Sequence, residues 1–367
     1  MKKEWEGWGL AVVVTAGVVL GHSEWVAGQG RVSALFVLGD SLVDVGNNNY
    51  LASIARANYF PYGIDFNFRP TGRFCNGKTF VDLLGDLLGV SSPPAFADPN
   101  TSGIRILGGV NYASAAAGIL EETGQHYGAR YSLSQQVLNL ETTLNQLRGM
   151  LSPANFTDYL AKAIVVLVFG SNDYINNYLM PDLYSSSFTY TPPAFANLLL
   201  NRYARQLLAL NSLGLRKLFI AGIGPLGCIP NQRASGRAPL GRCLDSVNQM
   251  LGTFNEGLRS LVDQLNQRSQ GAIFAYGNTY GAVGDILNNP TAYGFSVIDR
   301  ACCGIGRNQG QITCMPLQYP CPNRTQYVFW DAFHPTQTVN SILARRAFYG
   351  PPSDSYPVNV QQMSLLH

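Results

Sequence analysis

The sequence predicts an α/β fold with a mostly parallel central sheet and helices on both of its faces. Short apolar strands alternate with longer amphipathic helices along almost the whole chain. Hydrophobic residues make up 46% of the 367 residues, which is enough for a large buried core. The 38 glycines and 20 prolines indicate many turns and ordered loops around this regular core, and a helical bundle would not need them.

Four short apolar segments are predicted to be buried strands. The clearest covers residues 163–169, which are nearly continuous in β-branched and aromatic residues and stop at Gly170. The four strands, in chain order, are residues 33–38, 163–169, 215–221 and 271–276.

The segments between and after the strands have the apolar spacing of helices. Residues 78–88 show the pattern, since apolar side chains recur every three or four positions until Gly89 ends the helix. We expect one domain over residues 29–367, with a loose Pro-rich tail from about Tyr349, because no linker, charge block or repeat divides the chain. The predicted helices are residues 78–88, 134–150, 193–213, 242–268 and 335–348.

Residues 1–28 have the features of a secretory signal peptide. Two lysines precede an apolar run over residues 10–20, which is shorter than the roughly 20 residues that a membrane span needs. Val26 and Gly28 are small enough for a cleavage site. The alternative is an uncleaved anchor, but no later apolar run reaches spanning length, so we expect no stable membrane anchor in the mature protein.

Sequons and cysteines also favour secretion. Four of the seven cysteines fall within residues 302–321, a pattern typical of a disulfide-bonded loop. Zinc binding is the alternative, but this spacing does not match tetrahedral ligation and no histidine lies nearby. One thiol must remain unpaired, and the sequence does not identify it. Three N-glycosylation sequons begin at Asn100, Asn155 and Asn323.

The charge of the chain argues against nucleic acid as a partner. The 25 basic and 22 acidic residues give a net charge of only +3, and no cluster of lysine and arginine concentrates it.

Polar residues follow two of the predicted strands. In parallel sheets, sites form beyond the carboxyl ends of the strands. Ser41 follows the first strand in Gly39-Asp40-Ser41, which is not the Gly-x-Ser-x-Gly elbow. Its hydroxyl would be an exposed nucleophile, although an ordinary helix cap is the alternative. Asn172 follows the strongest strand, where its amide would donate to an oxyanion or merely shape a turn.

Only two histidines are candidate bases. Of the four, one lies in the signal segment and one is the last residue, which leaves His126 and His334. Asp331 precedes His334 by three residues, a spacing that allows the carboxylate to orient the imidazole. A capping aspartate beside a surface histidine is the alternative. Residues 111–118 are rich in small side chains, suited either to backbone contact with a substrate or to close helix packing.

These four motifs together resemble those of plant GDSL esterase/lipases in the SGNH-hydrolase superfamily. They occur in the family's order over residues 36–336. The resemblance implies a three-layer α/β/α fold, an ester substrate, no metal and no cofactor. It implies a Ser41, Asp331 and His334 triad, with the amides of Ser41 and Ala115 and the Asn172 side chain as oxyanion donors. Ala115 departs from the family pattern, which has glycine there, and Asp40 is expected to be structural.

We therefore expect a secreted serine esterase or lipase that forms an acyl-enzyme. One alternative is an acyltransferase that passes the acyl group to an alcohol through the same triad. The other is a catalytically silent binding protein of the cell wall. The expected partner is a small-molecule or polymer-bound ester, and the expected location is extracellular, in the cell wall or apoplast. The sequence leaves open which ester is bound, how the cysteines pair and whether the chain oligomerises.

Overall fold

The computed structural model describes Met1, residues 32–237 and residues 242–366. The predicted signal peptide, apart from Met1, lies outside the described residues. Within the described part of the chain, no helix has both the length and the apolar character needed to cross a membrane.

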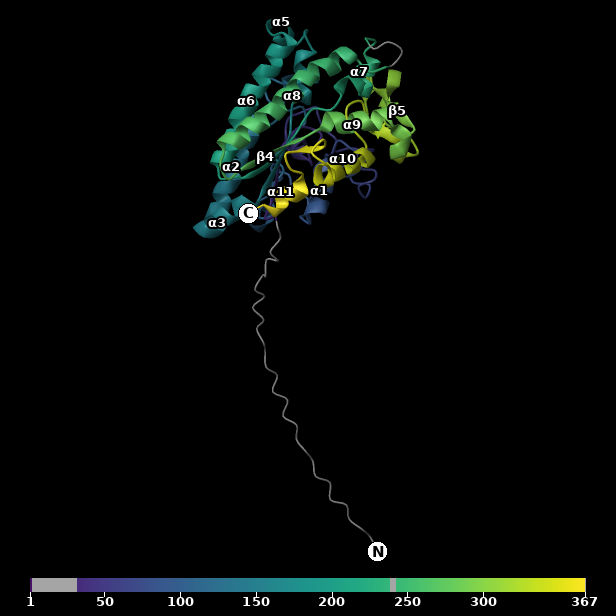
Figure 1. Ribbon diagram of the computed structural model, residues 1–367. Coiled ribbons are helices and arrows are strands. Elements are labelled where there is room, and N and C mark those ends of the chain that lie inside the picture. The colour runs from purple at the N-terminus through teal and green to yellow at the C-terminus, as the bar shows by residue number, and fades with distance from the viewer. Residues whose placement is uncertain (2–31, 238–241, 367) are drawn as a thin grey trace. The chain divides into compact units, whose positions relative to one another are not determined.

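A five-stranded sheet forms the centre of the fold (Figure 1). Its order is β1 (Leu35–Gly39), β2 (Ile164–Val168), β3 (Lys217–Ala221), β4 (Ile273–Gly277) and β9 (Ser355–Tyr356). The first four strands are parallel and pair in register, so that Gly39, Val168, Ala221 and Gly277 lie in one row at their carboxyl ends. β9 pairs antiparallel with β4. The predicted α/β class with a mostly parallel sheet is confirmed.

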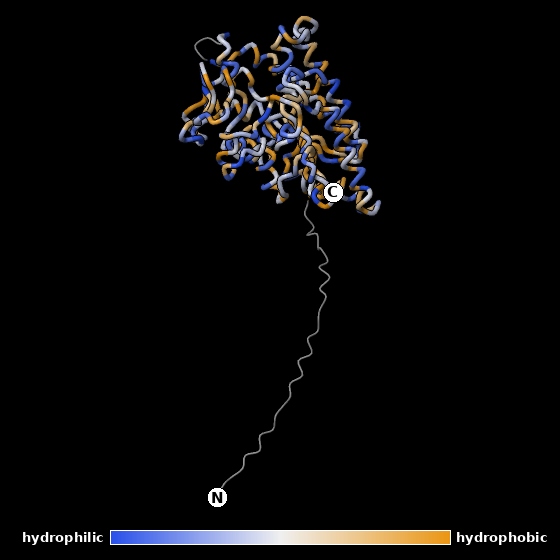
Figure 2. Tube along the Cα trace, turned by 180° about the vertical axis from the view of Figure 1, so that it is seen from behind, coloured by the Kyte–Doolittle hydropathy of each residue, from blue (hydrophilic) through white to orange (hydrophobic). Residues whose placement is uncertain are grey.

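Helices cover both faces of the sheet and make three layers. On one face, alternate strand residues such as Phe36 and Leu218 pack with the residues of the long helices α6 and α8, which lie side by side in Figure 1. The helices of this layer are α2 (Leu133–Met150), α3 (Pro153–Lys162), α6 (Pro192–Ser212) and α8 (Asp245–Arg268). Hydrophobic and hydrophilic stretches alternate along these helices, as amphipathic packing requires (Figure 2).

The other face carries the remaining alternate residues, including Val37 and Phe219. The helices here are α1 (Phe80–Leu88), α10 (Gln337–Tyr349) and α11 (Val360–Leu365), with α9 (Thr279–Asn288) beside α10. α1 begins at a capping box in which Thr79 and Asp82 exchange hydrogen bonds, and it ends at Gly89 in the left-handed conformation. The five predicted helices and four predicted strands begin and end within three residues of their predicted bounds, whereas α3, α9, α11 and β9 were not predicted.

The expectation of a loose tail from about Tyr349 is wrong. β9 extends the sheet, and the single helix α11 inserts Val360 and Met363 into the core beside α10, both fully buried. Asn359 caps this helix in a capping box. Two apolar residues on one helical turn are too short a pattern to distinguish from a loop by periodicity alone.

Candidate active site

Ser41 lies in the turn that follows β1. Gly39, the last residue of the strand, is packed so closely that a Cβ there would lie 2.4 Å from Val43 Cγ2 and 2.9 Å from the Val168 carbonyl oxygen. The buried side chain of Gln136, from α2, accepts a hydrogen bond from the Gly39 amide and donates one to the Gly39 carbonyl, both at 2.8 Å. These contacts fix the end of β1, and with it the position of Ser41.

Asp331 and His334 lie in a tight loop after β8 (Tyr327–Phe329). The Trp330 amide donates to the His334 carbonyl oxygen at 2.8 Å and closes this loop. Asp331 Oδ1 accepts the backbone amides of Phe333 at 2.9 Å and of His334 at 2.8 Å. The carboxylate thus organises the backbone of the loop that carries the imidazole.

The three side chains form a continuous hydrogen-bonded chain. His334 Nδ1 lies 2.8 Å from Asp331 Oδ1 and 2.9 Å from Oδ2, and His334 Nε2 lies 2.8 Å from Ser41 Oγ. A carboxylate accepts hydrogen bonds only, so the proton of a neutral imidazole is held on Nδ1. Nε2 then carries no proton and is able to accept one from the Ser41 hydroxyl.

Asp331 is fully buried, yet it is held in the ionised form. Burial acts to raise the pKa of its carboxyl, but the neighbouring His334 and the hydrogen bonds from His334, Tyr62 and Phe333 outweigh it, so that the pKa lies below its usual value. The buried Tyr62 hydroxyl donates to Asp331 Oδ2 at 2.5 Å. A negatively charged Asp331 carboxylate is able to stabilise a positive charge on the neighbouring His334 ring.

Asn172 comes to the same place from the next strand. It lies in the short helix α4 (Ser171–Asp173) after β2. Its Nδ2 donates to the Ala117 carbonyl oxygen at 2.9 Å, and its Oδ1 accepts from Asn176 Nδ2 at 2.6 Å. These bonds fix the amide plane and occupy one of the two Nδ2 hydrogens, so the other is available to a ligand.

The structure argues against the expectation that the Ala115 amide is an oxyanion donor. This amide already donates to Asp44 Oδ2 at 3.1 Å and to Asn48 Oδ1 at 3.0 Å. The next residue, Ala116, has a left-handed backbone with φ of 66°. Within the described part of the chain, neither its amide nor that of Ser41 has a hydrogen-bond partner.

A cavity of about 260 Å³ opens beside these groups. Ser41, His334, Asn172 and Ala116 all line it. The structure therefore gathers a hydroxyl, an oriented imidazole and three N–H groups around one mostly apolar space, which is the arrangement that acyl transfer requires.

Comparison with known proteins decides the family. The profile of the GDSL-like lipase/acylhydrolase family matches residues 35–347. The chain belongs to this family. It is similar to the Arabidopsis thaliana protein named GDSL esterase/lipase At1g71250, with 74% identity over 100% of this chain and 98% of the relative. GDSL esterase/lipase At5g08460 from the same plant is 55% identical, covering 98% and 93% of the two chains, and GDSL esterase/lipase 7 is 48% identical, covering 97% and 99%.

The other candidate histidine of this GDSL-family chain is not at the site. His126 Nδ1 is hydrogen-bonded to the Tyr184 hydroxyl at 2.7 Å, and the ring packs on Tyr127. The histidine hydrogen-bonded to Ser41 is His334.

Asp40, next to the candidate nucleophile, has a contact that fits a structural role. Its Oδ1 accepts the Leu42 amide at 2.9 Å and so shapes the turn around Ser41. Its Oδ2 is buried and has no hydrogen-bond partner among the residues that the structure describes, and burial raises the pKa of the carboxyl to about 7.

Sequence reasoning missed three residues that shape this GDSL-family site. Tyr62 touches the Asp331 carboxylate, Gln136 holds the end of β1, and Ala116 presents a free amide. Tyr62 and Gln136 act across separations of 269 and 97 residues, and no local pattern marks them. The run of small residues indicates the segment that contains Ala116, but it does not indicate that Ala116 has a left-handed backbone.

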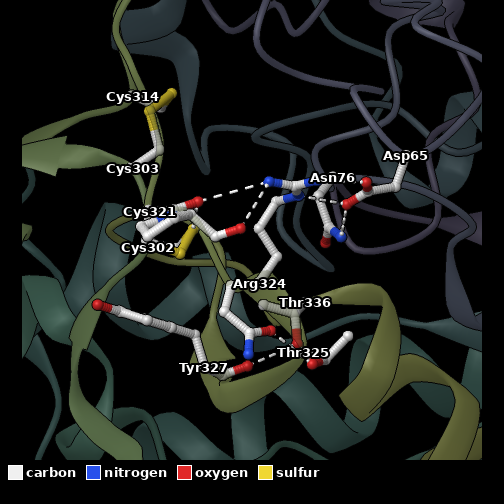
Figure 3. The surroundings of a disulfide bond; sticks show 12 residues. Asp65, Asn76, Cys302, Cys303, Cys314, Cys321, Arg324, Thr325, Tyr327 and Thr336 are labelled. Carbon is white, nitrogen blue, oxygen red and sulfur yellow. Dashed lines mark hydrogen bonds and ion pairs between the residues drawn. A yellow bond between two sulfur atoms is a disulfide. The ribbon is translucent and has the colours of Figure 1, made fainter.

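The cysteines pair within loops near the site. Cys302 bonds to Cys321 and Cys303 to Cys314, as expected of a disulfide-bonded loop, and the third bond joins Cys228 to Cys243. The unpaired thiol is the buried Cys75. Figure 3 shows Arg324 between this loop and Asp65. Its guanidinium donates to the Cys321 carbonyl oxygen at 3.5 Å and forms a bidentate ion pair with Asp65 at 2.6 and 2.8 Å.

All three sequon asparagines are exposed. Asn100 and Asn323 lie in loops, and Asn155 lies in the first turn of α3. The exposed side chains are accessible for glycosylation, which remains a prediction.

Proposed function

We propose that this protein is a secreted serine hydrolase that cleaves carboxylic esters through an acyl-enzyme. Its membership of the GDSL-like lipase/acylhydrolase family supports an ester-hydrolysing activity. The observation that carries the mechanism is the hydrogen-bonded chain from Ser41 Oγ through His334 to Asp331, with both nitrogens of the imidazole engaged.

In the first half-reaction, Ser41 Oγ attacks the ester carbonyl carbon while His334 Nε2 takes the hydroxyl proton. Asp331 holds the imidazole by Nδ1 and stabilises the imidazolium that forms. Collapse of the tetrahedral intermediate breaks the carbon–oxygen bond to the alcohol, which leaves with the proton from Nε2. Ser41 then carries the acyl group.

In the second half-reaction, water repeats these steps in place of serine. His334 takes a proton from the water as its oxygen attacks the acyl carbon, and then returns a proton to Ser41 Oγ. The products are a carboxylic acid and regenerated enzyme.

The negative charge on the intermediate is stabilised by three donors: the amides of Ser41 and Ala116 and the free Nδ2 hydrogen of Asn172. Such donors are typically worth about 3–4 kcal/mol each. The unpaired Ala116 amide is presented by a left-handed backbone, a conformation that costs a non-glycine residue of order 1–3 kcal/mol and that is concentrated at functional sites.

Three features support the proposal of secretion. The N-terminal sequence has signal-peptide character, the structure contains three disulfides, and the three sequon asparagines are exposed. We place the protein outside the cell, in the wall or apoplast.

The test is Ser41→Ala beside the wild-type glycosylated protein. We expect the variant to keep its thermal midpoint and its fold, to lose more than 99% of ester turnover and to escape labelling by a fluorophosphonate. Product analysis with an added alcohol distinguishes hydrolysis from acyl transfer. An Ala variant with more than a few per cent of the wild-type rate would exclude Ser41 as the nucleophile.

A further inference from the structure

The cavity at Ser41 continues far beyond the catalytic groups. It passes from Ser41 along the carboxyl end of the sheet, beneath α10 and beside α9, to Arg346 and Asp354. The inner channel is the part of this cavity lined by Phe219, Ala221, Ala282, Val339, Leu343 and Ala347. It lies in the layer between the sheet and α10, where a packed core would otherwise be expected.

The walls of the inner channel are apolar. Val339, Leu343 and Ala347 come from α10 at spacings of four residues, so they share one face of that helix. The opposite wall is the end of the sheet, where Phe219 and Ala221 of β3 line the channel.

Small side chains keep the inner channel open. Ala221 and Gly277 end two neighbouring strands, and Ala282 lies opposite on α9. An apolar void of this kind costs a protein stability, and such voids remain dry and bind apolar molecules. The channel therefore has the chemistry of a site for a hydrocarbon chain.

Charged groups mark where the apolar path ends. The Arg346 guanidinium forms ion pairs with Asp285 at 2.8 Å and with Asp354 at 2.5 Å. Both Arg346 and Asp354 border the cavity. Contact with charged groups does not stabilise the methyl end of a bound hydrocarbon chain, so we expect the chain to end before it reaches them. The apolar path from Ser41 is thus of limited length.

The outer part of the cavity is different. Ile54, Arg56 and Tyr127 line it near Ser41, and the Ile54 side chain is 78% exposed. The alcohol of an ester must leave and water must enter during each turnover, which suits this open side. The acyl group stays bonded to Ser41 Oγ, which suits the enclosed one.

We propose that the inner channel binds the acyl chain of the substrate, so that the enzyme acts on esters of medium- to long-chain fatty acids. This proposal rests on the proposed function, since it assumes an acyl group on Ser41. Burial of each methylene favours binding by a factor of roughly four. An octanoyl ester has six methylenes more than the acetyl ester of the same alcohol, which sets a limit of roughly 4,000-fold in kcat/KM if all six are buried, and we expect a ratio of at least about a hundredfold.

The experiment compares acyl lengths in wild type and in variants that fill the inner channel. Leu343→Trp and Val283→Phe narrow it from two different helices, α10 and α9. Arg345→Trp adds the same bulk on the exposed side of α10 and is the matched control. Thermal midpoints and labelling by a small fluorophosphonate show which variants are folded.

We expect the octanoyl-to-acetyl ratio of kcat/KM to fall at least tenfold in both channel variants and to be unchanged in Arg345→Trp. An octanoyl-to-acetyl ratio of kcat/KM near one in wild type overturns the proposal before any variant is made. The proposal is also overturned if this ratio stays high in channel variants that are folded. An octyl acetate series affected by the variants in place of the octanoyl series would put the alcohol in the channel, which also overturns it.

Failure of the underlying function gives a different result. If no ester, including acetyl esters, is hydrolysed and Ser41 is not labelled, the serine-hydrolase proposal fails and the channel proposal fails with it. Acetyl hydrolysis without dependence on acyl length refutes the channel proposal alone.

Discussion

Tyr62→Phe should change the pH dependence of catalysis through a residue that does not touch the nucleophile. The phenylalanine keeps the ring, which packs edge-to-face on Phe74 and Trp330, and removes only the hydroxyl. That hydroxyl donates to the buried Asp331 Oδ2 at 2.5 Å, and the remaining donor to this oxygen is His334 Nδ1 at 2.9 Å.

The size of the effect follows from the charge of the acceptor. A hydrogen bond to a charged group is worth about 1.5–3 kcal/mol. The Tyr62 hydroxyl helps to lower the pKa of Asp331, so its loss leaves a more basic carboxylate that favours the imidazolium form of His334. We expect the acid limb of kcat/KM to move upward by about half a pH unit or more, with a stability loss of about 1.5–3 kcal/mol.

Steady-state kinetics from pH 4.5 to 9, with chemical denaturation at pH 7, measure both effects. Tyr59→Phe is the control, because the Tyr59 ring packs on Tyr62 but its hydroxyl donates to the Cys314 carbonyl oxygen at 2.8 Å. That variant should lose stability without moving the acid limb. An acid limb at the wild-type position in Tyr62→Phe, or an equal shift in Tyr59→Phe, would refute the reasoning.

Three other predictions concern buried polar groups. Asn172→Ala should lower kcat by roughly 10²–10³-fold with little change in KM, as steady-state kinetics will show, and a loss of stability alone would contradict an oxyanion role. Asp82→Asn, which breaks the buried bidentate pair with Arg73, should cost about 3–5 kcal/mol at pH 7 by chemical denaturation. The pKa of Asp82 is lowered to about 2, chiefly because the bonds to Arg73 outweigh burial, so this difference should shrink as the pH falls from about 4 toward 2. Burial raises the pKa of Asp40 to about 7, so wild type should lose free energy of unfolding relative to Asp40→Asn as pH rises from about 4 to 7, and parallel pH–stability curves would argue against it.

Much of the fold was predictable because each strand ends in a recognisable way. Apolar runs that stop at Gly39 and Gly170 mark where β1 and β2 turn, and parallel strands bring such turns to one edge of a sheet. Ser41 and Asn172 therefore line one cavity, as their places in the sequence predict.

The proposed donor in the small-residue segment was not predictable, because adjacent alanines differ only in backbone geometry. Ala115 turns its amide toward Asp44 and Asn48, whereas the left-handed φ of Ala116 leaves its own amide free. Sequence spacing carries no information on that choice. Tyr62 was missed for a related reason, since its contact with Asp331 is tertiary and both flanking sequences look like ordinary loops.

The sequence separation of 293 positions from Ser41 to His334 has a consequence for biosynthesis. Translation at about 5–20 residues per second separates the emergence of the serine from that of the histidine by roughly 15–60 s. During that interval the nascent chain holds a hydroxyl with no base beside it. Partial chains that end before Asp331 are therefore expected to be inert, and hydrolytic activity should begin only when the chain is nearly complete.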